Sequence, residues 1–161
     1  MSTPTPTPPL TVLVPVDGSA TALAAVQHAI ALQRHGLALE VLLVNVQPPP
    51  TLYEVVLAHD AERLDAVRAA AGADLLAPAE ALLREAGLAF ESEVLGGEPA
   101  PTLLDRIETA GAACVILGAR GAGESGERHA TPGRVALAVL QHAPVPVTLV
   151  HDPEPPESAE D

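Results

Sequence analysis

Nearly continuous runs of apolar residues constrain the fold of this chain more than any other feature. They cover residues 10–16, 39–46, 114–117 and 145–150. A strand with one solvated face alternates apolar and polar residues, whereas a continuous run indicates burial on both faces. The runs therefore predict a parallel sheet. Pro146 lies near the start of the last run, where a proline is tolerated, or on an edge strand.

Helical segments separate the first strands. Ser19 is a favourable N-cap for a helix over residues 20–35, which has cations in its last turn and a glycine just past its end. Residues 51–86 hold a longer helical segment, in two pieces if it is divided near Gly72 or Pro78. Both segments are long enough to cover a face of the sheet.

The second half of the chain repeats the alternation. Residues 90–95 form a less apolar strand, which we expect at a sheet edge, and helices follow up to about Ala110 and over residues 132–142. The helical residues expected to face the core are Leu23, Val26, Ile30, Leu103, Leu104, Ile107, Val135, Val139 and Leu140.

The alternation of strand and helix predicts an α/β fold, a doubly wound five-stranded parallel sheet with helices on both faces. In such sheets a ligand binds beyond the carboxyl ends of the strands, where the winding reverses. We expect one domain over residues 10–151. Residues 1–9 alternate proline with threonine or serine, and residues 152–161 are acidic, so both ends are expected to be disordered.

The charge balance argues against two classes of partner. The formal net charge is −13, and five of the 21 acidic residues lie in the last ten positions. The rest of the chain is still acidic, and all eight basic residues are arginines. Nucleic acids and anionic membranes require a basic face, so neither is an expected partner.

Three further observations favour a cytoplasmic location. Cys114 is the only cysteine, which excludes an internal disulfide and suits a reducing compartment. The first residues lack the positive charge and apolar run of a signal peptide. No apolar segment reaches the roughly 18 residues that a membrane span needs.

The most informative stretch for function is residues 114–135. A strand at 114–117 is followed by residues 118–135, which hold five glycines, three arginines and the pair Thr131-Pro132, a favourable helix start. Backbone N–H groups exposed by glycine and directed by a helix N-terminus bind anions, most often phosphate.

Other readings of these motifs are weaker. A Walker P-loop requires a lysine, and the chain has none. Gly121, Gly123 and Gly126 match the spacing of a dinucleotide fingerprint, but the helix starts too late and the acid expected downstream is missing. The six histidines show no metal-ligand spacing, and Ser19 suits a cap better than a nucleophile.

Asp17 is the acid that bears most on function. It closes the first buried strand at the predicted ligand crevice. Two interpretations remain open: a carboxylate that caps the following loop, or one that accepts hydrogen bonds from a ribose.

Six segments, taken together in their order and spacing, resemble the universal stress protein family. They are residues 14–19, 41–46, 95–99, 115–121, 133–136 and 140–147, and the resemblance covers about residues 10–151. It implies the strand order 3-2-1-4-5, a homodimer paired through strand five (145–150), and a cytoplasmic role in the stress response. Some members of the family bind ATP or AMP, and others bind no nucleotide.

The resemblance also implies positions for a nucleotide site without catalytic residues or a protein-bound metal. Asp17 and Gly118 would hold the ribose, the backbone of Val46 would meet adenine, and Val16 and Leu117 would be apolar walls. The positions implied for the phosphates are Gly121, Gly133, Arg134 and Val135, and Pro15, Arg120 and Thr131 complete the site. Any Mg²⁺ or Mn²⁺ would be carried by the nucleotide.

The sequence departs from the family's ATP pattern, Gly-x2-Gly-x9-Gly-Ser/Thr. Gly118 and Gly121 fit, but Gly133, which stands for the third glycine of the pattern, comes after eleven residues and not nine, and Arg134 replaces the hydroxyl residue. Asn45 stands where a histidine is common. Two outcomes are physically sensible: Arg134 supplies charge and Thr131 the hydroxyl, or the longer segment, which adds Glu124 and Glu127, repels a polyphosphate.

Three functional hypotheses follow. The first is a stress regulator that binds ATP or AMP without efficient turnover, and is therefore not an enzyme. The second is a family member that binds no nucleotide and acts as a homodimeric protein-interaction module. The third and weakest is a slow ATPase.

Overall fold

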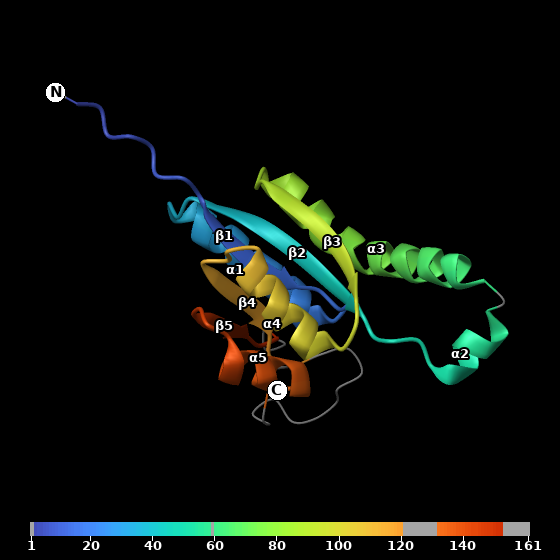
Figure 1. The fold of residues 1–161 in the computed structure, drawn as a ribbon. Helices are drawn as coiled ribbons and strands as arrows, with labels where there is room; N and C mark the ends of the chain where they lie inside the picture. Colours follow the sequence, from blue (N-terminus) through green and yellow to red (C-terminus); the bar gives the residue numbers. More distant parts are fainter. Residues whose placement is uncertain (1, 59, 121–131, 153–161) are drawn as a thin grey trace, which may run out of the picture.

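A parallel five-stranded sheet forms the centre of the computed structural model, which describes residues 2–58, 60–120 and 132–152. The strands lie in the order β3-β2-β1-β4-β5, and every neighbouring pair is parallel (Figure 1). The strands are β1 (Leu10–Pro15), β2 (Leu39–Gln47), β3 (Phe90–Gly96), β4 (Cys114–Gly118) and β5 (Val147–Val150). The predicted fold class and strand order are confirmed.

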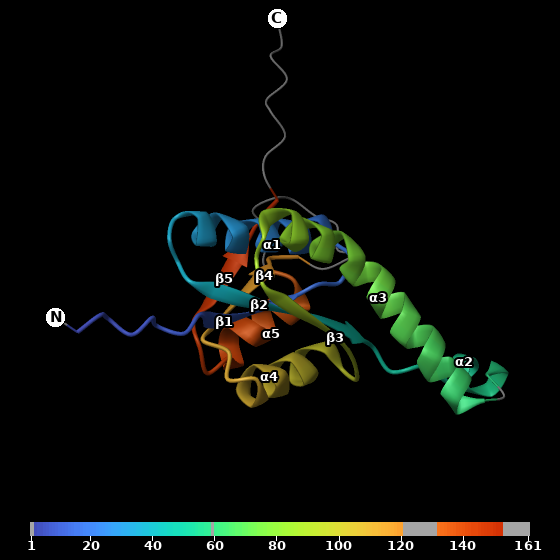
Figure 2. The same cartoon turned by 90° about the horizontal axis from the view of Figure 1, so that it is seen from above.

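Helices cover both faces of this sheet. They are α1 (Ala20–Arg34), α2 (Leu52–Leu57), α3 (Ala61–Ala86), α4 (Pro99–Thr109) and α5 (Arg134–His142). The helices α1 and α3 lie over one face and α4 and α5 over the other, as the view in Figure 2 shows. The winding therefore reverses between β1 and β4, where a doubly wound sheet opens its ligand crevice.

The central strands have a hydrophobic core on each side. In β1, Val12 and Val14 pack toward α1 and α3, whereas Leu13 packs toward α4 and α5, and all three side chains are fully buried. Burial on both faces explains why the apolar runs are nearly continuous. The less apolar strand β3 lies at an edge, as predicted.

Local signals start α1, as the sequence predicts, and end α3. Ser19 is the N-cap of α1, and its Oγ accepts a hydrogen bond from the N–H of Ala22 at 3.2 Å. Gly87 ends α3 in the left-handed conformation, with φ of 70°, which glycine adopts at little cost.

The predicted division of residues 51–86 is in the wrong place. The break falls between Leu57 and Ala61, because a Thr51–Glu54 capping box starts α2 and the Asp60 side chain caps α3. The helix α3 passes through Gly72 and Pro78 without ending. Packing holds it together there, since its buried residues, Leu76, Ala79 and Leu83, lie on either side of the proline.

The start of α5 also differs from the prediction. The helix begins at Arg134 with Gly133 as its N-cap, not at Pro132. The N–H of Gly133 donates to the carbonyl of Ala119 at 2.7 Å, which keeps this residue outside the helix. The predicted cap, Thr131, lies outside the described residues.

Two details in the last third of the chain differ from the prediction: the exposure of Leu140 and the residue at which β5 begins. Leu140 is 45% exposed, so its predicted core position is wrong; it lies in the last turn of α5, and Ala136 and Val139 are the buried residues. β5 begins at Val147, after Pro146, whose carbonyl accepts the N–H of Val115.

Cys114 is partly buried, and burial raises the pKa of its thiol.

We expect Gly72→Ala to destabilise the protein, although alanine is the better helix former by about 1 kcal/mol. A Cβ at Gly72 would lie 2.5 Å from Val94 Cγ1 and 2.9 Å from Asn45 Oδ1. Overpacking of this kind costs about 1–3 kcal/mol, which outweighs the propensity gain. Urea unfolding would measure it, with Ala71→Gly, an exposed neighbour, reporting propensity alone. A more stable Gly72→Ala protein would contradict the close packing.

The ion pair between Glu93 on β3 and Arg106 on α4 predicts a pH dependence. The Arg106 guanidinium donates to both Glu93 oxygens, at 2.6 and 2.7 Å, and holds the pKa of Glu93 below its ordinary value of 4.5. A carboxyl group whose pKa is lowered in the folded state stabilises the protein at pH values above its unfolded-state pKa. This stabilisation is lost as the pH falls through the folded-state pKa.

Glu93→Gln should therefore lower the free energy of unfolding by about 1 kcal/mol at pH 7. The difference from the unmodified protein should shrink as the pH falls below about 4.5. Urea unfolding at several pH values measures both effects, and Glu85→Gln, at an exposed position on α3, is the control. A difference that stays constant down to pH 3 would contradict the assignment.

Candidate functional site

A cleft of about 470 Å³ opens at the carboxyl ends of the strands. The pairing of β1 with β4 covers only Val12 with Cys114 and Leu13 with Val115, although both strands continue further. The pairing uses the middle of β1 and the first two residues of β4, so the carboxyl ends of both strands lie beyond it, and the cleft opens there. The residues lining the cleft are Pro15, Val16, Asp17, Ser19, Ala22, Val44, Asn45, Val46, Gln47, Pro48, Leu75, Pro99, Leu103, Leu117, Gly118, Arg120, Val135 and Ala136.

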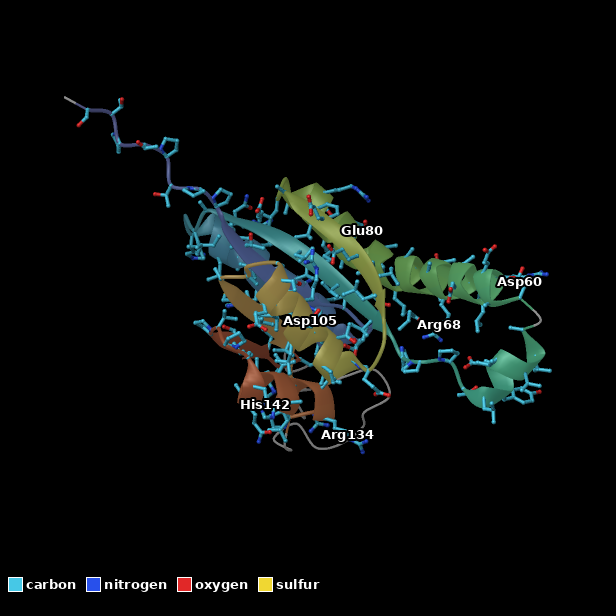
Figure 3. All side chains as sticks on the ribbon, in the orientation of Figure 1. Asp60, Arg68, Glu80, Asp105, Arg134 and His142 are labelled. Carbon is cyan, nitrogen blue, oxygen red and sulfur yellow. The ribbon has the colours of Figure 1, made fainter. Side chains whose placement is uncertain are left out.

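Most residues selected from the sequence meet at this cleft. Those that line it are Pro15, Val16, Asp17, Val46, Leu117, Gly118, Arg120 and Val135. Gly133 and Arg134 do not line it but stand at the start of α5, directly before Val135, and Figure 3 labels Arg134 there. Gly121 and Thr131 lie outside the described residues.

Asp17 has a defined local role. Its Oδ1 accepts the N–H of Ser19 at 2.9 Å, and the Ser19 hydroxyl in turn caps α1. The Asp17 side chain is exposed at the cleft wall. A carboxylate has several acceptor positions, so this turn contact is compatible with a second hydrogen bond from a ligand hydroxyl.

Gly118 forms part of the cleft because it has no side chain. A Cβ there would collide with Thr21 of α1, including its backbone carbonyl carbon at 2.8 Å. The Thr21 hydroxyl donates to the carbonyl of Arg120 at 2.5 Å. These contacts hold the segment that leaves β4 against α1, so its backbone is fixed where it faces the cleft.

A buried amide fixes the opposite side. Asn45 is only 2% exposed, and its Nδ2 donates to the carbonyl of Val16 at 2.8 Å. Its Oδ1 accepts from Gln47 Nε2, also at 2.8 Å. The amide therefore joins the carboxyl ends of β1 and β2. Within the described residues no buried side-chain nitrogen or oxygen lacks a hydrogen-bond partner.

Positive charge and a helix terminus lie on the remaining side. Arg120 lines the cleft after β4, and Arg134 and Val135 are the first two residues of α5. The first N–H groups of a helix have no intrahelical acceptor and favour anions. The N–H of Gly133 is bonded to Ala119, so this one predicted phosphate donor already has an acceptor in the structure.

Several lining residues were missed by the sequence reasoning. Leu75 reaches the cleft from α3, where a Cβ at Gly18 would lie 2.7 Å from its Cδ2. Gln47 ends β2, Pro48 follows it directly, and Pro99 begins α4. Only Gln47 gave a usable signal, a polar residue at the end of an apolar strand.

The described part of the chain contains no group of three or more His, Cys, Asp or Glu side chains that could hold a metal ion. Among the described helices, none has the length and apolar character that a membrane crossing needs.

The family model for the universal stress protein family matches residues 10–151. The chain belongs to this family. A comparison with curated protein sequences gave no significant match. The match spans every strand and helix that the structure describes, together with the cleft.

Solved structures share the fold of this universal stress protein. Hypothetical protein MJ0577 is 21% identical, with a TM-score of 0.75 over 91% of this chain and 98% of its own. An Arabidopsis thaliana family member with AMP bound is 16% identical, with a TM-score of 0.64 over 94% of this chain and 100% of its own. The Archaeoglobus fulgidus universal stress protein in complex with dAMP is 19% identical, with a TM-score of 0.58 over 89% and 98%.

We expect Asn45→Leu to lower the free energy of unfolding by about 1–3 kcal/mol, because it leaves the carbonyl of Val16 without its donor. Gln47→Leu should cost less, because that side chain is only partly buried. Urea unfolding of both variants measures the difference. Equal losses would contradict the role of Asn45 as the joint between β1 and β2.

Proposed function

We propose that this universal stress protein is a cytoplasmic regulator in the stress response that binds ATP or AMP at the β1/β4 cleft without efficient turnover. One observation carries the proposal: the cleft has apolar walls, a carboxylate at one side, and Arg120 and the start of α5 at the other, where Arg134 is the first helical residue. An adenine nucleotide has an apolar base, hydroxyls that donate to a carboxylate, and anionic phosphates. The chemistry of the cleft matches all three parts.

Each part of the ligand has a proposed position. Adenine lies between Val16 and Leu117, with the backbone of Val46 at its polar edge. The ribose hydroxyls bind Asp17 and the backbone of Gly118. The phosphates point toward Arg120 and the start of α5 at Arg134 and Val135. The AMP and dAMP complexes of two proteins with this fold support the choice of an adenine nucleotide.

The chemical groups among the described cleft residues support slow turnover. Asp17 is the one carboxylate among the described lining residues, and it already accepts the N–H of Ser19. Efficient hydrolysis requires a positioned base or water-orienting residue. Mg²⁺ or Mn²⁺ would arrive with the nucleotide, bound to its phosphates.

A second function is favoured by the position of β5. In the described sheet β5 pairs with β4 alone, so its outer edge is available to a second copy. A homodimer through β5 is compatible with nucleotide binding, and also with an interaction module that binds none. The longer spacing after Gly121 adds Glu124 and Glu127, whose negative charge would repel a polyphosphate. This feature favours the interaction module that binds no nucleotide.

Thermal unfolding with ATP, ADP or AMP plus magnesium tests the proposal. A nucleotide at about 100 times its dissociation constant should stabilise the fold by roughly 2.7 kcal/mol. The gain should fall in Asp17→Ala, which removes the ribose acceptor, and in Arg134→Gln, which removes a phosphate charge. Asp74→Ala, at an exposed position on α3 outside the cleft lining, is the matched control.

Each variant is compared with itself in the absence of nucleotide, because Asp17→Ala also removes the turn contact with Ser19. If no nucleotide raises the melting temperature of the folded protein, nucleotide binding is wrong and the homodimeric module remains. If Asp74→Ala loses the gain as fully as Asp17→Ala does, the ligand binds elsewhere.

A further inference from the structure

The helix α2 presents apolar side chains to solvent on all sides. Its sequence is Leu-Tyr-Glu-Val-Val-Leu, and none of its six residues is buried. Leu52 is 80% exposed and Tyr53 73%, and the other three apolar residues are at least 49% exposed. A helix that is apolar all round is normally buried, so this one is built to be covered.

The body of the protein does not cover α2. The segment Pro48-Pro49-Pro50 leads the chain away from β2, and α2 lies beyond the sheet, beside the start of α3 (Figures 1 and 2). We call residues 51–58 and 60–68 the arm. Val67 of α3 adds a further apolar side chain to it, 59% exposed. Isolated helices this short are unstable in water, and the capping box adds only modest stability.

We propose that the arm is a dimerisation surface that packs against the arm of a second copy of this chain. The exposed apolar surface supports this occupant. The apolar side chains of two arms would together remove on the order of 1,000 Å² from water, close to the lower bound of a stable protein interface. Against a polar partner surface only one arm would supply apolar side chains, so about half as much apolar area would leave water.

The charges of the arm are also compatible with self-association. It carries acidic residues and two arginines, Arg63 and Arg68, so a two-fold rotation can bring opposite charges together. In Figure 3, Arg68 extends from α3 toward the side on which α2 lies. An anionic membrane is a poor alternative, because the chain has a net charge of −13.

The arm is distinct from the β5 edge. It adjoins α3, which packs on β2 and β3, whereas β5 is the strand at the opposite edge of the sheet (Figure 1). The two surfaces can thus operate at once, and pairing at both would give assemblies larger than a dimer. The proposal for the arm rests on its exposed apolar residues and does not require that the chain bind a nucleotide.

The first test is the mass of the full chain by light scattering over a range of concentrations. The double variant Leu52→Gln and Val56→Gln should have about half the mass of the unmodified protein. Both side chains are exposed, so the fold should be retained, which circular dichroism checks. Leu37→Gln, an exposed apolar residue just before β2, is the matched control and should leave the mass unchanged.

The second test places the contact. In a Cys114→Ser background, Tyr53→Cys should form an intermolecular disulfide under mild oxidation, and Glu85→Cys at the exposed far end of α3 should not. An unchanged mass in the double variant, or equal cross-linking at both positions, overturns the proposal. So does a monomeric protein whose arm binds anionic vesicles, because the occupant is then a membrane.

Discussion

The short pairing between β1 and β4 is the constraint on which the rest of the site depends. Only two residue pairs join these strands, and they use the middle of β1 and the first two residues of β4. Each strand is paired on its other side, β1 with β2 and β4 with β5. The sheet therefore stays continuous while its centre opens at the carboxyl end. Because the winding reverses at the same place, no crossover helix fills the gap, and the cleft is a consequence of topology.

An open end of this kind leaves backbone groups that require partners, and three contacts provide them. The amide of Asn45 binds the carbonyl of Val16, and the hydroxyl of Thr21 binds the carbonyl of Arg120. The carbonyl of Ala119 accepts the N–H of Gly133 and so sets where α5 starts. The cleft is thus held open by polar contacts at its rim, while the apolar layers on both faces of the sheet stabilise the body.

The sequence predicted what depends on local pattern and missed what depends on tertiary contact. The strands could be predicted because burial on both faces gives them continuous apolar runs. The start of α1 could be predicted because Ser19 is a favourable N-cap. Leu75 could not be found in advance, because nothing near it in the sequence shows that α3 crosses the cleft beside Gly18. The start of α5 was misplaced for the same reason: a hydrogen bond to Ala119 outweighed the local preference for Pro132.

The helix α3 connects the two surfaces to which we assign function. Val67 lies in the arm and Leu75 lines the cleft, eight positions apart and therefore about 12 Å along one helix. Leu75 also lies so close to Gly18, the residue after Asp17, that a Cβ there would be 2.7 Å from Leu75 Cδ2. A ligand that contacts Leu75 and a second copy that contacts the arm would act on the same rigid element. Such a shared element couples two binding events only where one ligand favours a position of α3 that the other also favours. Where that condition holds, a nucleotide bound at the proposed site would change how the chain assembles through the arm.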